Sequence, residues 1–458
     1  MRRSAELDPA ARALIEKRLG LYLPETRHGD LARGILAGAR SSSIGGPEEY
    51  LSWLAALPDE SPEWRQLAAR LTVGETYFFR DEACFEALEQ EILPALIATR
   101  RSQGNRRLRL WSAACATGEE AYSLAIVLDR VLSDRSDWAV TIMATDINTE
   151  SLATARRGVY REWSFRDTAP EMRDRYFVHR GLQTYELHPR IRTMVTFAPL
   201  NLAVDVYPSA ITNTSAVDVI FCRNVLMYFT PEIQKATVAR LAHALVPDGW
   251  LAVSPAEGSA DLFSRLAHVS FPRAVFYRKD AAPAVLTPPR WPVEMDVPNA
   301  SHSWSRAEVE VVPVTVTPEG RADDAPEAVA PLKHARSLAD RGDLDGARRR
   351  CEAVLARERL DPEAYLLLAA ICQEQGDVPG ALAALRRALY LAPDSPLAHF
   401  LGGTLRFRQG DDRGGRRAMT TAVRLLGRLA RDEVVPGTDG VMAGRLLATA
   451  HLYVEPQR

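Results

Sequence analysis

Residues 111–123, "WSAACATGEEAYS", decide the fold of the central part of this chain. They complete an apolar segment, "LRLWSAA" (108–114), pass through the loop "CATG" (115–118) and begin the helical pattern "EEAYSLAIVL" (119–128). A buried strand, a short loop and a helix in this order form the unit of a doubly wound α/β domain. Ligands of such domains bind beyond the carboxyl ends of the strands, so we expect this loop to line a binding site.

The composition of this loop restricts the class of ligand. Its small residues, including Ala114 and Gly118, let a ligand approach the backbone closely, but the GxGxxG pattern of a dinucleotide site is missing. Glu119 and Glu120 at the helix start would repel a pyrophosphate. Two carboxylates favour a cationic ligand, and S-adenosylmethionine carries both a sulfonium and an ammonium group.

The α/β alternation continues to about Lys279, with further apolar segments at 140–146, 217–224 and 250–255. Asp146 ends the second segment, where a carboxylate in this architecture accepts hydrogen bonds from ribose hydroxyls.

Both polar residues at the ends of these segments have alternative interpretations. Asp146, Asn148 or Thr149 could instead cap the helix that follows. Asn224, after the third segment, could contact the adenine or amino-acid part of the cofactor, or could be a turn asparagine.

The rest of the chain divides by composition. We expect an N-terminal helical domain at 1–75, the α/β domain at 76–280, a Pro-rich linker at 281–327 and a helical domain at 328–458.

The helical domain carries an internal repeat. Gly342, Gly376 and Gly410 follow one another at intervals of 34 residues, the period of tetratricopeptide repeats, although three unrelated helical hairpins remain an alternative. Such repeats form concave surfaces for peptides or helices, so we expect a protein or peptide partner there.

Bulk properties exclude several classes of protein. A chain of 458 residues with a net charge of -2 has room for about three domains and no overall attraction to nucleic acid. Its five cysteines lack CxxC spacing, which argues against a disulfide framework and a metal site. No signal peptide and no apolar stretch of about 18 residues is present, so we expect a cytoplasmic protein without direct membrane insertion.

Six motifs together resemble those of CheR-type chemoreceptor glutamate methyltransferases, and the resemblance covers about residues 8–279. In order, they are "LTVGETYFFRD" (71–81), "WSAACATGEEAYS", "ATDIN" (144–148), "PLNL" (199–202), "FCRNVLMYF" (221–229) and "PDGWLAVSPAE" (247–257). The resemblance implies an α/β fold of the Rossmann-like S-adenosylmethionine methyltransferase type, with a small β-subdomain inserted at about 176–198. It also implies methylation of glutamate side chains in the cytoplasmic methylation region of a chemoreceptor, which sets receptor adaptation in membrane receptor arrays.

The resemblance also assigns individual residues. Contacts with S-adenosylmethionine, or its product S-adenosylhomocysteine, fall on Thr76, Arg80, Ala114, Glu120, Asp146, Asn201, Leu202, Asn224 and Val225. Arg80 and Tyr228 fall beside the transferred methyl group as the catalytic residues, and no metal is implied. Gly74 departs from the enteric-type pattern, which has an asparagine there. The side chain that would make one of the family's cofactor hydrogen bonds is therefore missing from this chain.

The reaction needs no general base, because a glutamate with an ordinary pKa of about 4.3 is already ionised at pH 7. Arg80 would then position the carboxylate, and Tyr228 would donate a hydrogen bond or pack beside the methyl group. In the alternative interpretation, Arg80 pairs with Asp81 or Glu82, and Tyr228 and Phe229 are core aromatics.

Two further features concern partners. Basic residues on the N-terminal helices could contact the acidic methylation region of a receptor or could simply be solvated: Arg12, Lys17, Arg18, Arg27, Arg33 and Arg40. The segment 178–194 lacks the longer glycine-containing loop with which relatives hold a C-terminal receptor pentapeptide, so we expect pentapeptide-independent action.

Two other functions fit the same fold. One is a non-catalytic S-adenosylmethionine-binding scaffold whose repeats recruit signalling partners, and the other is a small-molecule or RNA methyltransferase. Basic patches interleaved with exposed aromatics, which RNA recognition requires, are not evident in the sequence.

Overall fold

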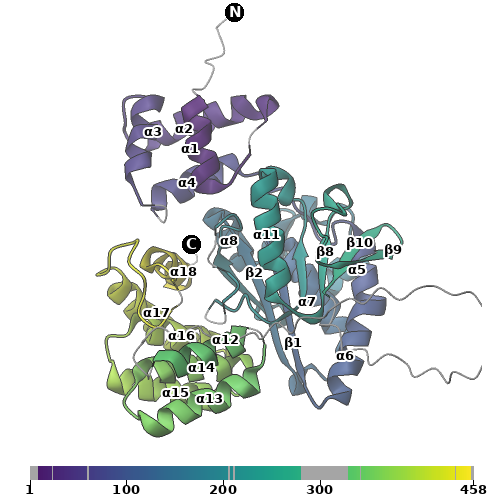
Figure 1. Ribbon diagram of the computed structural model, residues 1–458. Helices are drawn as coiled ribbons and strands as arrows, with labels where there is room; N and C mark the ends of the chain where they lie inside the picture. The colour runs from purple at the N-terminus through teal and green to yellow at the C-terminus, as the bar shows by residue number, and fades with distance from the viewer. Residues whose placement is uncertain are drawn as a thin grey trace, which may run out of the picture.

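The computed structural model describes residues 9–454, except 23, 59–60, 205–206, 210–211, 280–328, 341 and 439 (Figure 1). The proposed linker at 281–327 therefore lies outside the described residues. The first helices are α1 (Pro9–Leu19), α2 (His28–Ser41), α3 (Pro47–Ala56) and α4 (Pro62–Leu71). Local capping explains the start of α4, because the Ser61 side chain accepts a hydrogen bond from the backbone N–H of Trp64 and Pro62 occupies the first turn.

A seven-stranded sheet forms the centre of the molecule, in the order β6-β2-β1-β7-β8-β10-β9. In chain order the strands are β1 (Arg107–Ala113), β2 (Ala139–Asp146), β6 (Val195–Pro199), β7 (Val217–Cys222), β8 (Leu245–Val253), β9 (Ala267–Phe271) and β10 (Ala274–Arg278). The four predicted apolar segments are β1, β2, β7 and β8, and these strands pair in parallel along the sheet. The antiparallel edge formed by β10 and β9 was not predicted.

Helices cover both faces of this sheet, which confirms the doubly wound fold. Side chains alternate along β1, so that Leu108 and Leu110 join one apolar core while Trp111 and Ala113 join another. The first core also contains residues of α5 (Glu82–Ala87), α6 (Leu93–Ser102), α7 (Glu119–Val131) and α8 (Thr149–Arg157). The second is shared with α11 (Pro231–Ala244) and with the N-terminal helices, which are thereby attached to the sheet.

A small three-stranded sheet is inserted before β6, as the resemblance implied. It contains β3 (Val159–Arg161), β4 (Phe177–Gly181) and β5 (Thr184–Leu187) in the order β3-β5-β4. The short helices α9 (Pro170–Tyr176) and α10 (Pro189–Arg192) flank the β4–β5 hairpin. The expected limits of 176–198 therefore differ from the structure, because β3 precedes them and β6 belongs to the large sheet.

The C-terminal region is a series of helical hairpins: α12 (Val329–Asp340), α13 (Leu344–Arg357), α14 (Pro362–Glu374), α15 (Val378–Leu391), α16 (Pro396–Arg408), α17 (Asp412–Leu426) and the final α18 (Ala443–Val454). Gly342, Gly376 and Gly410 have φ of 85°, 75° and 78°, a conformation that only glycine adopts readily. An aspartate directly after each glycine caps the next helix through the backbone N–H three residues further on. The same turn chemistry in all three hairpins confirms the repeat.

The repeats pack against the amino ends of the parallel strands, at the edge opposite their carboxyl ends. Glu374 of α14 lies 3.4 Å from Arg109 of β1, and the Arg408 guanidinium lies 3.4 Å from the Thr141 hydroxyl of β2. The Arg156 guanidinium stands 4.2 Å over the ring of Tyr453 in α18. The carboxyl edge of the sheet faces the N-terminal helices and loops, and α18 reaches it at the end of β6 through Arg445 and Ala448.

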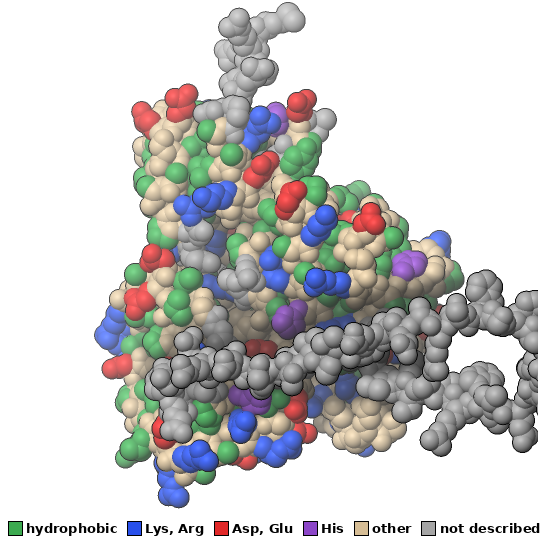
Figure 2. Space-filling view, viewed as in Figure 1, with side chains coloured by type: hydrophobic (Ala, Val, Ile, Leu, Met, Phe, Trp, Pro, Cys, Tyr) green, Lys and Arg blue, Asp and Glu red, His purple; other side chains and the backbone are tan. Residues whose placement is uncertain are grey.

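Charged side chains of both signs are scattered over the visible face of the molecule (Figure 2), in keeping with the net charge of -2. Such mixing does not create the large single-sign field that steers a protein onto a polyanion. Within the described residues, no helix is both long and apolar enough to cross a bilayer.

Candidate functional site

A cavity lies at the carboxyl ends of the parallel strands. All the site residues predicted from the sequence line it: Thr76, Arg80, Ala114, Glu120, Asp146, Asn201, Leu202, Asn224, Val225 and Tyr228. The N-terminal helices close one side through Leu19, Tyr22 and Arg27. The structure thus brings together residues as far apart as Leu19 and Phe229, separated by nearly half of the chain.

The loop after β1 has an unusual backbone. Ala114, Ala116 and Gly118 have φ of 68°, 47° and 92°, all in the left-handed region. For alanine this conformation costs of order 1 kcal/mol and is often found at functional sites. Gly118 is required for a second reason, because a Cβ at this position would lie 2.7 Å from the Cβ of Ala155.

Asp146 closes this loop from the end of β2. Its Oδ2 accepts the N–H of Ala116 and its Oδ1 accepts the N–H of Asn148, each at 2.8 Å. Burial raises the carboxyl pKa, and these backbone N–H groups oppose the shift. The helix cap is Asn148, whose side chain accepts from Glu150 and Ser151, so Asp146 is not needed for capping. Asp146 also lines the cavity, which places its carboxylate within reach of a bound ligand.

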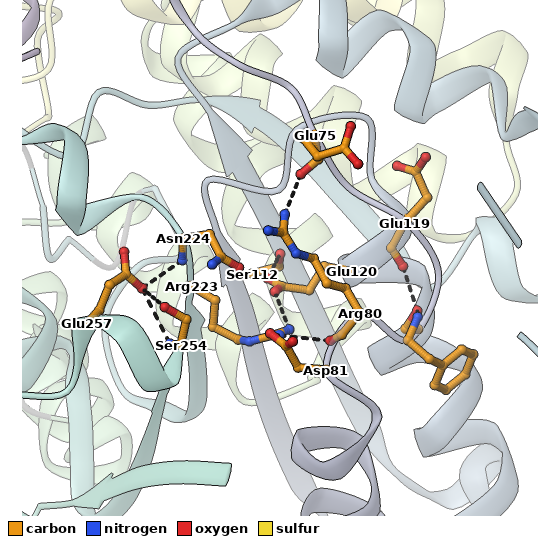
Figure 3. Close-up of polar contacts among 12 residues, drawn as sticks. Glu75, Arg80, Asp81, Ser112, Glu119, Glu120, Arg223, Asn224, Ser254 and Glu257 are labelled. Carbon is orange, nitrogen blue, oxygen red and sulfur yellow. Dashed lines mark hydrogen bonds and ion pairs between the residues drawn. The ribbon is translucent and has the colours of Figure 1, made fainter. Parts of the chain in front are cut away.

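The two glutamates that start α7 have different environments (Figure 3). Glu120 lines the cavity, where Ser112 donates to Oε1 at 2.7 Å and Arg223 donates to Oε2 at 3.1 Å. Glu119 is not among the residues lining the cavity; it is buried against the hydroxyls of Thr117 and Ser164. The expectation that both carboxylates face the ligand therefore holds for Glu120 alone.

Arg223 is a central residue that the sequence reasoning missed. It is 5% exposed and binds Glu120, the Asp81 carboxylate and, at 2.8 Å, the carbonyl of Arg80. It therefore fixes the 72–81 segment to the sheet. The negative charges of Glu120 and Asp81 offset the desolvation cost of burying the Arg223 guanidinium. The available signal was an arginine directly after a strand that is apolar apart from Asp218.

Glu257 holds the turn after β7 and was also missed. Its carboxylate accepts the N–H groups of Asn224 and Val225, each at 2.7 Å, and the hydroxyl of Ser254 at 2.7 Å (Figure 3). Asn224 has φ of 56°, a left-handed turn conformation that asparagine tolerates. Asn224 is thus a turn residue and a cavity residue at once.

The two predicted catalytic residues line the cavity from different segments, Arg80 just before α5 and Tyr228 just after β7. Arg80 donates to the carbonyl of Glu75 at 2.6 Å, and the ion pair of Asp81 is with Arg223 instead. The alternative in which Arg80 pairs with Asp81 is therefore wrong, and its pairing with Glu82 stays a prediction.

Tyr228 differs from its neighbour Phe229, which is buried in the core. The Tyr228 ring is half-buried and has the Arg27 guanidinium 5.6 Å from its centre. The Tyr22 N–H donates to the Tyr228 carbonyl at 2.6 Å, which ties the N-terminal domain to this side of the cavity.

Asn201 already has partners within the protein. Its amide donates to the carbonyl of Leu19 at 3.3 Å and accepts from the N–H of Ala203 at 2.9 Å. The neighbouring Leu202 is buried, and its carbonyl accepts from Thr237 at 3.1 Å. Direct contacts of Asn201 and Leu202 with a cofactor therefore stay predictions.

The cavity does not present an activated thiol. Cys115 lines it, but burial raises its thiol pKa well above the ordinary value, which disfavours a thiolate nucleophile. Among the described residues no group of three His, Cys, Asp or Glu side chains could hold a metal ion.

Comparisons with known proteins agree with this architecture. The model of the family described as CheR methyltransferase, SAM binding domain, matches residues 74–272, and a tetratricopeptide repeat model matches residues 332–396. Chemotaxis protein methyltransferase 1 of Pseudomonas aeruginosa is 36% identical over 212 residues, which are 45% of this chain and 74% of that protein. The probable biofilm formation methyltransferase WspC of Pseudomonas putida is 32% identical over 389 residues, 81% of this chain and 88% of that protein. Its counterpart in Pseudomonas aeruginosa is 27% identical over 426 residues, 90% of this chain and 97% of that protein.

Proposed function

Since the chain belongs to the CheR methyltransferase family, we propose that it transfers a methyl group to glutamate side chains of a chemoreceptor. The observation that carries the proposal is the single cavity in which Arg80 and Tyr228 adjoin the residues expected to hold the cofactor. A transferase of this kind sets receptor adaptation, and the ester it forms neutralises one receptor carboxylate.

The cavity fits S-adenosylmethionine, the cofactor of this family. Glu120 supplies a carboxylate for the cationic part, although Arg223 offsets part of its charge. Asp146 keeps lone pairs for ribose hydroxyls, while Leu202 and Val225 supply apolar wall for the base. When bound, the cofactor supplies a methyl group on a sulfonium sulfur, ready for displacement by a carboxylate oxygen.

The protein's own contribution is alignment. A receptor glutamate is ionised at neutral pH and needs no base. The Arg80 guanidinium can hold one carboxylate oxygen while the other attacks, and its bond to the Glu75 carbonyl limits how far it can move. Tyr228, supported by Arg27, confines the other side, and correct orientation can lower a barrier by about 7–11 kcal/mol.

The proposal also includes independence from a receptor pentapeptide. The β4–β5 hairpin turns through Leu182 and Gln183 alone, with φ of 48° and 59°, so it has little loop with which to grip a peptide. Weak or undetectable binding of a receptor C-terminal pentapeptide to the whole chain would support this part, and tight binding would contradict it.

Labelled methyl transfer to a purified cytoplasmic receptor fragment tests the proposal. Both relatives that match along the repeats are named for biofilm formation, so a receptor from such a pathway is the first substrate to assay. The label should be released by mild base, as an ester is, whereas N-methyl groups resist base. Label that resists base would overturn the assignment to carboxylates.

A matched pair of arginine variants locates the chemistry. Arg80→Ala should lower kcat/KM by about 100-fold, the scale seen when one positioned donor is lost. Arg106→Ala, at the opposite edge of the sheet, should leave the rate unchanged, because its pair with Asp137 is exposed. Normal S-adenosylhomocysteine binding without any transfer by the wild-type chain would favour the scaffold alternative instead.

A further inference from the structure

The first helix of the middle repeat, α14, is largely buried. Leu366, Ala370 and Gln373 follow helical spacing along one side and are each 6% exposed or less. The second helix, α15, buries one side only, and its Arg386 and Arg387 are exposed. Repeat proteins of this class normally offer a helical face to partners. In this chain something already covers that face.

One covering element is the connection between α17 and α18. We call residues 433–438 and 440–442 the strap. Its backbone folds back on itself through an antiparallel bridge between Val434 and Met442 and a 2.9 Å hydrogen bond from the Val435 N–H to the Val441 carbonyl. Val435 and Val441 are 0% and 1% exposed and belong to the apolar core of the repeats.

The strap lies on the first helices of three successive repeats. A Cβ added to its Gly437 would lie 3.2 Å from Leu366 of α14 and 3.5 Å from Leu397 of α16. Arg336 of α12 donates a 3.1 Å hydrogen bond to the Gly437 carbonyl. The strap therefore crosses the same side of α12, α14 and α16 that a peptide ligand would use.

The sheet covers the other end of this side. Glu374, at the end of α14, pairs with Arg109, and a Cβ on Gly376 would lie 2.6 Å from the Cβ of Ala139. The strap and the amino edge of the sheet therefore cover opposite ends of the same side of α14. Within α14 only Glu363, in the first turn, is classed as exposed, so little of this side is left open for a partner.

We propose that the first helices form a peptide-binding groove that the strap occupies in cis, and that a partner segment of similar chemistry displaces it. The strap contributes two aliphatic side chains, a tight turn and a carbonyl to Arg336, so the partner segment should carry paired aliphatic residues beside a turn and little charge. The groove would remain closed until such a partner is present. This inference concerns the repeats alone and does not depend on the proposed methyl transfer.

A synthetic peptide of residues 431–443 is the probe, with its binding followed by fluorescence anisotropy. The first protein is the full chain with 433–442 replaced by a Gly/Ser segment of equal length, and the second is the unaltered chain. The replaced chain should bind the peptide, and the unaltered chain should bind it at least about 100-fold more weakly, because a tethered competitor acts at an effective concentration near millimolar. A control peptide with Val435 and Val441 both changed to Asp should bind neither protein.

A second variant guards against a folding failure of the first. Gly437 has φ of 81°, which strains a valine, and a Cβ at this position would lie 3.2 Å from Leu366. Gly437→Val should therefore release the strap, and it leaves the groove residues unchanged. It should also bind the peptide, and circular dichroism should show unchanged helix content. If neither variant binds the peptide while both retain their helices, or if the unaltered chain binds it equally well, the strap is a permanent part of the fold and the proposal fails.

Discussion

Replacing Arg223 by methionine would test how the cavity is held together. The Arg223 side chain is 1% exposed and its partners Glu120 and Asp81 are 12% and 38% exposed. Methionine keeps much of the volume but removes the charge, leaving the Glu120 carboxylate with the Ser112 hydroxyl as its remaining donor among the described contacts. The 72–81 segment would lose its anchor at the same time.

The expected loss of stability follows from this geometry. Removing one partner of a buried ion pair costs about 3–5 kcal/mol, because the other charge stays buried. Asp81 adds little, since a carboxylate that is more than a third exposed is screened by solvent. Arg223→Met should therefore reduce the free energy of unfolding by about 3–5 kcal/mol at pH 8.

The loss should depend on pH with a definite sign. Burial raises the pKa of Glu120, opposed by Arg223, so removing Arg223 raises this pKa further. Between the unfolded pKa and the raised folded pKa, the folded state binds more protons, and stability falls as pH rises. The deficit relative to wild type should be smaller at pH 5 than at pH 8.

Urea unfolding followed by tryptophan fluorescence measures these differences, since Trp111 is buried beside the site. Arg106→Met, at an exposed pair, is the matched control and should cost less than about 1 kcal/mol. The double variant Arg223→Met with Glu120→Met should recover part of the loss, because no buried charge is left alone. The reasoning would be refuted if Arg223→Met lost no more free energy of unfolding than Arg106→Met, or if the double variant were less stable than Arg223→Met alone.

Three further predictions concern other parts of the molecule. Asp146→Asn should weaken S-adenosylhomocysteine binding in calorimetry by about 10- to 100-fold, since a bond to a charged group contributes about 1.5–3 kcal/mol; unchanged affinity would exclude a ribose contact. Gly118→Ala should lower the free energy of unfolding by more than about 1–2 kcal/mol, because its φ of 92° strains an alanine and its Cβ would clash with Ala155. Gly104→Ala, with open space around it, should lose only the free energy that comes from the backbone strain of a positive φ. Burial raises the pKa of Glu374 to about 7, so its stabilisation of the contact between repeats and sheet should be complete below pH about 4.5 and lost as pH rises through about 7. Hydrogen exchange in α14 should follow this profile, and Glu374→Gln should flatten it; the charged groups that act on Glu374 are Arg107, Arg109, Asp340 and Arg408.

Much of the fold could be predicted because its signals are local. The strand, loop and helix around residues 111–123 follow from apolar periodicity and from a glycine at the turn, and both act within a few residues. The repeats were predictable for the same reason, since Gly342, Gly376 and Gly410 each end a helix in the conformation that glycine alone adopts readily. Local patterns also placed the loop after the first strand, Asp146 and Asn224 at strand ends, which meet at one edge of a parallel sheet. The other candidate site residues were assigned through the resemblance to the family.

Only the tertiary structure decided which charges are paired and which face the cavity. Arg223 meets Glu120 and Asp81 across 103 and 142 residues of sequence, and Asn224 meets Glu257 across 33. The closure of the cavity by Arg27 and the covering of the repeats by the strap likewise join distant segments. The physical reason is that a side chain's own sequence neighbourhood sets its backbone conformation, while its burial and its partners depend on how whole elements pack.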